Sequence, residues 1–242
     1  MRYKAVVTYD GTNYSGWQIQ RGQVSVQEKI EEALERLFGA KTSIVGSGRT
    51  DAGVHAEGQV FSFESDTTIP QIRLYKAINA YLPEDIRVLS CEKTSADFNA
   101  RHSAKKKTYC YRLYCSEVEN PLKERYSVKI FPVDIDKMKE AAKLLIGEHD
   151  FKAFCSTGSS VKSTVRKIYS LNIKKAGEDI TITVCGNGFL YNMVRIIVGT
   201  LVGVGEGRIP LDNIKKALIC GDRTLVGKTL SAKGLTLKKV VY

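Results

Sequence analysis

The order of periodic segments in the first half of the chain limits the fold more than any other feature of the sequence. Residues 2–10 are rich in β-branched and aromatic side chains and predict a strand. Ser25 and Glu28 have the spacing of a capping box, and apolar residues at helical spacing follow as far as Gly39. Next come predicted strands at 42–46 and 58–64, a helix after Pro70 and a strand at 85–92. Strand, helix, strand, strand, helix, strand is the ferredoxin-like order, an antiparallel sheet backed by two helices.

The second half has a similar order after a polar and basic connector at residues 98–107. Its predicted elements are strands at 108–115 and 126–132, a helix capped by Asp134, a loop at 151–161, strands at 166–174 and 179–185, helices at 189–202 and 211–219, and a strand at 235–242. We therefore expect an α+β protein with two ferredoxin-like (RRM-like) halves, residues 1–104 and 105–242.

The charge of the chain favours an anionic partner. The 37 basic residues exceed the 26 acidic ones, which gives a formal net charge of +11. The basic residues cluster at 101–107, 162–167 and 233–239, a distribution that suits a surface following the phosphates of a nucleic acid. A merely soluble basic protein is the alternative.

The six cysteines form no CxxC pair, and the three histidines lack metal-ligand spacing, so we expect free thiols and no metal site. The amino terminus lacks the features of a signal peptide, and no apolar run reaches the ~18 residues that a membrane span needs. A cytoplasmic protein without a membrane partner is therefore expected.

The segment GRTDAGVHA, residues 48–56, concentrates polar chemistry in a glycine-bracketed turn between two predicted strands. It places Arg49, Asp51 and His55 within a few residues of one another. A firmly held turn with one acid is a good position for a nucleophile. The simpler interpretation is that Thr50 and Asp51 stabilise the turn through hydrogen bonds to their own backbone.

Arg195 is the only charged residue between Asp179 and Glu206, and it lies in an otherwise apolar predicted helix. A guanidinium in such surroundings needs a partner, so we expect it to meet Asp51 between the two halves. An arginine that extends into solvent from the helix edge is the alternative.

The segment KKKTYCYRLY, residues 105–114, interleaves basic and aromatic residues on a predicted strand. Tyr109 and Tyr111 share one face of it, and an aromatic ring beside a basic groove can stack on a base. Core packing is the commoner role for such residues. The segment GQVFSF at 58–63 is only loosely similar to the aromatic strand of an RNA-recognition motif.

Four segments in order along nearly the whole chain resemble the tRNA pseudouridine synthase A (TruA) family: YDGTNYSGWQ, GRTDAGVHA, FNARHSAKKKTYCYRL and GNGFLYNMVRIIVGTL. The resemblance implies an isomerase that converts uridine to pseudouridine in the anticodon stem-loop of tRNA, without cofactor or metal, as a homodimer. It implies two halves whose antiparallel sheets flank a basic active-site cleft. It also implies catalysis by Asp51 in residues 1–104, and substrate binding by Arg49. In residues 105–242 it implies a stacking Tyr109, an active-site Arg195 that pairs with the aspartate, and Leu235 in the base pocket.

One carboxylate suffices for this isomerisation, which breaks the bond between N1 and C1′ and rejoins the ring at C5. Attack of Asp51 on C1′, attack on C6, and a glycal route in which Asp51 removes a ribose proton all remain open. The alternatives to a synthase are a non-catalytic RNA-binding protein with tandem RRM-like folds and a glycoside or nucleoside hydrolase. The hydrolase would usually need two carboxylates, and GRTDAG supplies one.

Overall fold

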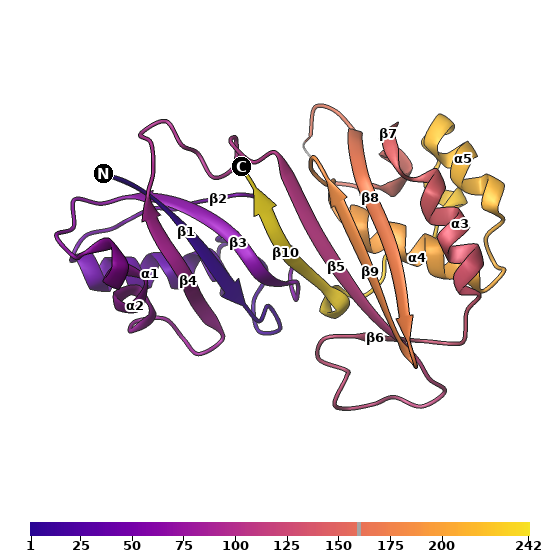
Figure 1. Cartoon of the computed structure of the whole chain (residues 1–242), viewed down its shortest axis with the longest axis horizontal. Helices are drawn as coiled ribbons and strands as arrows, with labels where there is room; N and C mark the ends of the chain where they lie inside the picture. The colour runs from indigo at the N-terminus through magenta and orange to yellow at the C-terminus, as the bar shows by residue number, and fades with distance from the viewer. Residues whose placement is uncertain (159–160) are drawn as a thin grey trace. The chain divides into compact units, whose positions relative to one another are not determined.

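The structure, a computed structural model, describes residues 1–158 and 161–242 (Figure 1). The chain is mixed α+β with mostly antiparallel strands, as predicted. It divides into two compact units, Met1–Lys105 with Thr236–Tyr242, and Lys106–Leu235. The end of the chain thus belongs to the first unit, whereas the sequence assigned it to the C-terminal half.

The first unit has the predicted ferredoxin-like order. Its elements are β1 (Arg2–Tyr9), α1 (Val26–Phe38), β2 (Val45–Gly46), β3 (His55–Glu64), α2 (Gln71–Asn79), β4 (Ile86–Lys93) and, from the end of the chain, β10 (Leu235–Val241). The strands β4, β1, β3 and β2 are neighbours in that order, and every pair is antiparallel. The strand β10 runs parallel to β3 and pairs with its first residues.

Helix α1 forms as the sequence predicts. The Ser25 side chain accepts a hydrogen bond from the backbone N–H of Glu28, and the Glu28 side chain accepts one from the backbone N–H of Ser25. Gly39 ends the helix in the left-handed conformation, at φ 71°. Val26, Ile30, Ala33 and Leu34 are fully buried, and the partly exposed Phe38 stacks on Phe63 of β3 with ring centroids 6.2 Å apart.

Two strands of the first unit differ in length from the prediction. Strand β2 is restricted to Val45 and Gly46, because the backbone N–H of the preceding Ile44 donates to the Glu31 side chain of α1 at 3.0 Å. Strand β3 begins at His55, inside the segment predicted as a turn. A distant part of the sequence causes this extension, since β10 pairs with β3 at His55 and Ala56.

The second unit contains β5 (Lys106–Cys115), β6 (Val128–Ile130), α3 (Ile135–Leu144), β7 (Gly147–Asp150), β8 (Val165–Ala176), β9 (Asp179–Gly186), α4 (Met193–Gly205) and α5 (Leu211–Cys220), with short 3-10 helices η1 (Lys152–Phe154), η2 (Arg223–Leu225) and η3 (Ala232–Gly234). The strands β5, β9, β8 and β7 are antiparallel neighbours in that order, and β6 runs parallel to β5. Helix α3 packs on β8 and α4 on β5 (Figure 1).

Strand β7 was not predicted from the sequence. Its residues GEHD include no β-branched or aromatic strand former, and only the pairing with β8 identifies it as a strand. Helix α4 begins at Met193 rather than 189, because Asn192 has the left-handed conformation at φ 60°. It continues to Gly205, past its predicted end. The predicted loop at 151–161 contains η1, and its residues 159–160 lie outside the described residues.

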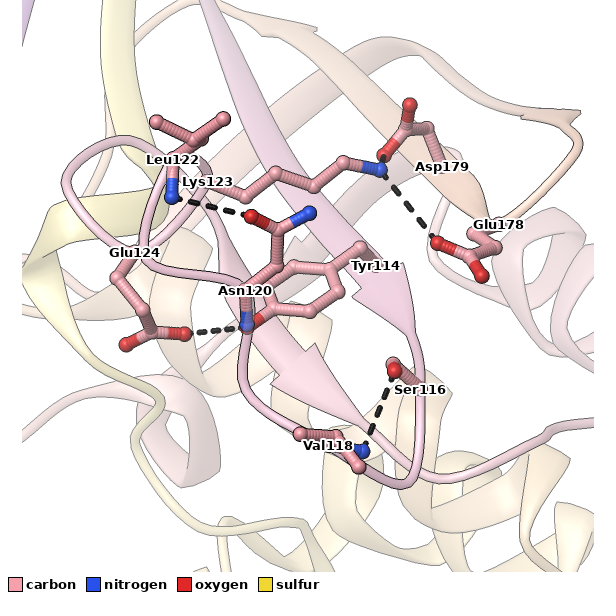
Figure 2. Close-up of polar contacts among 9 residues, drawn as sticks. All are labelled: Tyr114, Ser116, Val118, Asn120, Leu122, Lys123, Glu124, Glu178 and Asp179. Atoms are coloured by element: carbon pink, nitrogen blue, oxygen red, sulfur yellow. Dashed lines mark hydrogen bonds and ion pairs between the residues drawn. The ribbon is translucent and has the colours of Figure 1, made fainter.

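Side-chain contacts at Asn120, Lys123 and Glu124 hold the loop that joins β5 to β6 (Figure 2). Lys123 Nζ lies 2.6 Å from Asp179 Oδ1 and 3.8 Å from Glu178 Oε2 at the turn between β8 and β9. The Tyr114 hydroxyl donates to Glu124 Oε1 at 2.5 Å and accepts from the backbone N–H of Asn120 at 3.0 Å. This loop is therefore an ordered part of the second unit.

Candidate active site

Asp51 lies in the loop that joins β2 to β3, and its side chain is half-buried. The loop turns back at Gly53, which has φ 75°, and the Val54 N–H donates to the Asp51 carbonyl oxygen at 3.1 Å. Neighbouring Arg49 is exposed. The loop thus presents a carboxylate and a guanidinium from one short segment.

The loop is bonded to the segment after β1. The Trp17 N–H donates to the Thr50 carbonyl at 3.0 Å, and the Gly53 N–H donates to the Tyr14 carbonyl at 3.2 Å. Gly16 has φ 94°, and a Cβ there would lie 2.5 Å from the Thr50 carbonyl oxygen. Two of the segments that carry the family resemblance therefore form a single structure around Asp51.

Buried side chains of the protein core hold the loop in place. The hydroxyl groups of Tyr9 and Thr50 are 2.8 Å apart, and both residues are buried. Burial raises the pKa of the Tyr9 phenol, so this group stays protonated at neutral pH. The Gln59 side chain donates to the Gly48 carbonyl at 2.9 Å. These contacts support the expectation of a firmly held loop.

His55 lies at the exit of the loop. Its Nδ1 is 3.0 Å from the Gly11 backbone nitrogen and 3.1 Å from Asp10 Oδ1. The tautomer decides between these contacts, because an unprotonated Nδ1 accepts from Gly11 and a protonated one donates to Asp10. Either bond ties the start of β3 to the end of β1.

Arg195, in the second unit, is half-buried and bound to neighbouring chain segments. Its Nε donates to the Leu230 carbonyl at 2.7 Å, and one Nη donates to Asn192 Oδ1 at 2.6 Å. Asn192 in turn donates from its side-chain nitrogen to Ser156 Oγ at 2.9 Å. These contacts orient the guanidinium. Its expected pairing with Asp51 of the first unit stays a prediction.

Tyr109, in β5, is 9% exposed and contacts Phe189 edge to face, with ring centroids 5.2 Å apart. Packing of this kind is the alternative that the sequence left open, and a stacking role stays a prediction. Tyr111, two residues on, is fully buried and donates its hydroxyl to the Ser231 carbonyl at 2.6 Å.

The segment that leads to Leu235 contacts the elements that carry Arg195 and Tyr109. Leu230 accepts from Arg195, and the Gly234 backbone lies so close to Tyr111 that a Cβ would be 2.7 Å from the ring. Leu235 itself is buried. The second unit thus joins α4, β5 and the segment before Leu235, and the first unit carries Arg49 and Asp51.

None of the helices in the described part of the chain is both long and apolar enough to cross a membrane. Among residues 1–158 and 161–242, no group of three or more histidine, cysteine, aspartate or glutamate side chains is arranged to hold a metal ion.

A model of the family described as tRNA pseudouridine synthase matches residues 5–103 and 141–242. The range between them contains β5 with Tyr109. Proteins named tRNA pseudouridine synthase A are similar over their whole length. The one from Brevibacillus brevis is 46% identical over 100% of this chain and 99% of its own, and the one from Thermoanaerobacter sp. (strain X514) is 46% identical over 98% of both. The one from Bacillus licheniformis is 42% identical over 100% of this chain and 99% of its own. The chain therefore belongs to the tRNA pseudouridine synthase A family.

Proposed function

We propose that the chain converts uridine to pseudouridine in tRNA with Asp51 as its catalytic residue. The observation that carries the proposal is the full-length match to the family combined with the placement of its aspartate. Asp51 is half-buried, on a loop that backbone hydrogen bonds from Trp17 and Gly53 attach to the segment after β1. A fixed carboxylate is what a reaction with one nucleophile needs.

The isomerisation is redox-neutral. The bond between N1 and C1′ breaks, the uracil turns, C5 bonds to C1′, and the proton on C5 is lost while N1 gains one. Asp51 serves as nucleophile toward C1′ or C6, or as the base that removes a ribose proton in a glycal route. Each of these uses an ionised carboxylate within contact of the target nucleotide.

Four other residues are proposed to bind the substrate. Exposed Arg49 contacts the flipped nucleotide or its phosphate, and Tyr109 stacks on the uracil. Arg195 pairs with Asp51 and keeps it ionised, and Leu235 lines the base pocket. The net charge of +11 supports a tRNA substrate, and we place the target uridines in the anticodon stem-loop. The working form is proposed to be a cytoplasmic homodimer that needs neither metal nor cofactor.

The test is a pseudouridine assay on an unmodified tRNA transcript. Carbodiimide labelling and primer extension detect the product, which has the same mass as uridine. Wild type is compared with Asp51→Asn and with Asp66→Asn, a matched control because Asp66 is exposed and paired with the amino terminus at 3.0 Å. We expect new stops in the anticodon arm with wild type and Asp66→Asn only.

Two results would contradict the proposal in different ways. A folded wild-type protein that binds tRNA and yields no stops would favour the non-catalytic RNA-binding protein. Equal stops with Asp51→Asn would leave the synthase in place and remove Asp51 from its catalytic role. Stops outside the anticodon arm would leave the synthase activity and the role of Asp51 in place, and would change only the assignment of the target uridines.

A further inference from the structure

Polar side chains are buried around the loop of Asp51, on the side of the protein core. Ser47, Thr50, His55 and Gln59 are each at most 6% exposed. Burial of polar groups is unfavourable unless they are hydrogen-bonded, and a core made for stability alone would use apolar residues. Their concentration at one loop therefore calls for a local explanation.

Gln59 is hydrogen-bonded to two residues at the start of the loop. It is fully buried in β3, and its Nε2 donates to the Gly48 carbonyl at 2.9 Å. Its Oε1 accepts from the Ser47 hydroxyl at 2.5 Å and from the Val60 backbone N–H at 3.1 Å. The carboxamide thus binds both residues at the entrance of the loop.

The surroundings of Gln59 would suit an apolar side chain. Side chains alternate along a strand, so Gln59 lies on the same face of β3 as Phe61 and Phe63. Phe61 and Phe63 are core residues, and Phe63 stacks on Tyr3 with ring centroids 5.3 Å apart. Gln59 is the first residue of this row, and Ser47 and Gly48 of the loop supply hydrogen-bond partners for its side chain.

We propose that Gln59 is a positioning residue that fixes the entrance of the Asp51 loop in its working geometry. This inference rests on the proposed function of Asp51. Gly48 lies three residues before Asp51 along the chain, and the hydroxyl pair of Tyr9 and Thr50 holds the next part of the loop. Gln59 touches no substrate in this role and acts through the backbone at Ser47 and Gly48.

The expected consequence is a loss in the chemical step. A displacement of about 1 Å at a reacting group can lower the rate by on the order of a hundredfold. Gln59→Met keeps the length of the side chain and removes its hydrogen bonds. We expect kcat to fall about tenfold or more while KM for tRNA changes less than about twofold, since the phosphate-binding surface is untouched.

Gln59→Glu supplies a variant that can be switched by pH. A protonated carboxyl has the shape of the carboxamide and can donate to the Gly48 carbonyl, whereas an ionised one places an oxygen against it. Burial favours the protonated form. The ratio of kcat for Gln59→Glu to kcat for wild type should therefore rise as pH falls. Tyr9, the titratable neighbour of Gln59, and Tyr242, which bonds Ser47, both have pKa values raised by burial, so neither titrates in this range.

Thr42→Val is the matched control. Thr42 is a buried hydroxyl of the same unit, 8% exposed, and it donates to the Ala40 carbonyl at 3.1 Å, away from the loop. Its replacement should lower stability and leave kcat unchanged. All rates are measured on a defined tRNA transcript, below the unfolding temperature of each variant, and expressed per folded molecule by circular dichroism.

A fall in kcat for Gln59→Met, with a pH-dependent recovery in Gln59→Glu, would support the positioning role. If Gln59→Met does not fold, the pH profile of Gln59→Glu decides alone. Wild-type kcat per folded molecule in Gln59→Met would overturn the role and leave the proposed function standing, and so would a kcat of Gln59→Glu that stays equally far below the wild-type value at every pH. Absence of product with wild type would overturn both.

Discussion

Gly16 offers a direct test of the contact between the segment after β1 and the Asp51 loop. Its φ of 94° is a conformation that L residues rarely adopt. A Cβ at this position would lie 2.5 Å from the Thr50 carbonyl oxygen, 3.1 Å from the Asp51 carbonyl carbon and 3.2 Å from the Ala52 nitrogen. All three are backbone atoms, so Gly16→Ala must move the backbone that carries Asp51.

The structure contains a matched control a few residues away. Gly22 has φ 74°, and a Cβ there would meet no atom within 4 Å. Gly22→Ala therefore costs only the backbone conformation, about 1–2 kcal/mol. Gly16→Ala adds overpacking of about 1–3 kcal/mol, so its free energy of unfolding should fall by about 2–5 kcal/mol in all.

Urea unfolding followed by circular dichroism measures both variants, and the pseudouridine assay measures kcat. We expect Gly22→Ala to keep wild-type kcat, and Gly16→Ala to lose about tenfold to hundredfold at a temperature where it is folded. Equal unfolding midpoints for the two variants would show that the contact with Thr50 is not tight. Full activity in Gly16→Ala would show that the position of the loop backbone does not limit catalysis.

Three further predictions concern other parts of the chain. Ser25→Ala should lower the free energy of unfolding by ~1 kcal/mol in urea, and Ser25→Asp should restore most of it, because only an oxygen acceptor caps α1. Arg195→Lys keeps the charge but cannot reproduce the two bonds that orient the guanidinium, so kcat should fall about tenfold or more in the pseudouridine assay, and an unchanged kcat would remove Arg195 from the site. The Lys233 ammonium and the Tyr114 hydroxyl lower the pKa of Glu124, so this group stabilises the fold above its unfolded pKa and loses that effect as pH falls. The stability advantage of wild type over Glu124→Gln, measured in urea at several pH values, should therefore shrink below about pH 4.3.

The elements that the sequence predicted well are those whose signals are local. The capping box of Ser25 and Glu28 and the left-handed Gly39 define α1 without help from the rest of the chain. The predictions are wrong where pairing with a strand from elsewhere in the sequence determines whether a segment is a strand and where it begins. Strand β3 begins at His55 because β10 pairs there, and β7 exists because β8 supplies its partner. Pairing of this kind leaves no trace in the periodicity of one segment.

In the candidate site, too, the sequence identified residues with a local signal and missed one whose role depends on contacts in the folded protein. The motif marked Asp51 and Arg49, and the isolated charge marked Arg195, because residue type alone distinguishes them. Gln59 was missed, although a polar residue at a core position of the GQVFSF strand was a usable signal. Its interpretation requires the partners at Ser47 and Gly48, which only the folded loop brings to it.

The end of the chain completes the support of the Asp51 loop. Strand β10 pairs with β3 at His55 and Ala56, directly after the loop, and a Cβ on Gly58 would lie 2.6 Å from the Lys238 carbonyl oxygen. The Lys238 ammonium also pairs with Glu57. Residues 1–104 alone would leave this edge of β3 without its partner strand. The entrance of the loop is thus bonded by Gln59 from within β3, while its exit is held by residues 236–238, so the loop depends on two segments that lie far apart in the sequence.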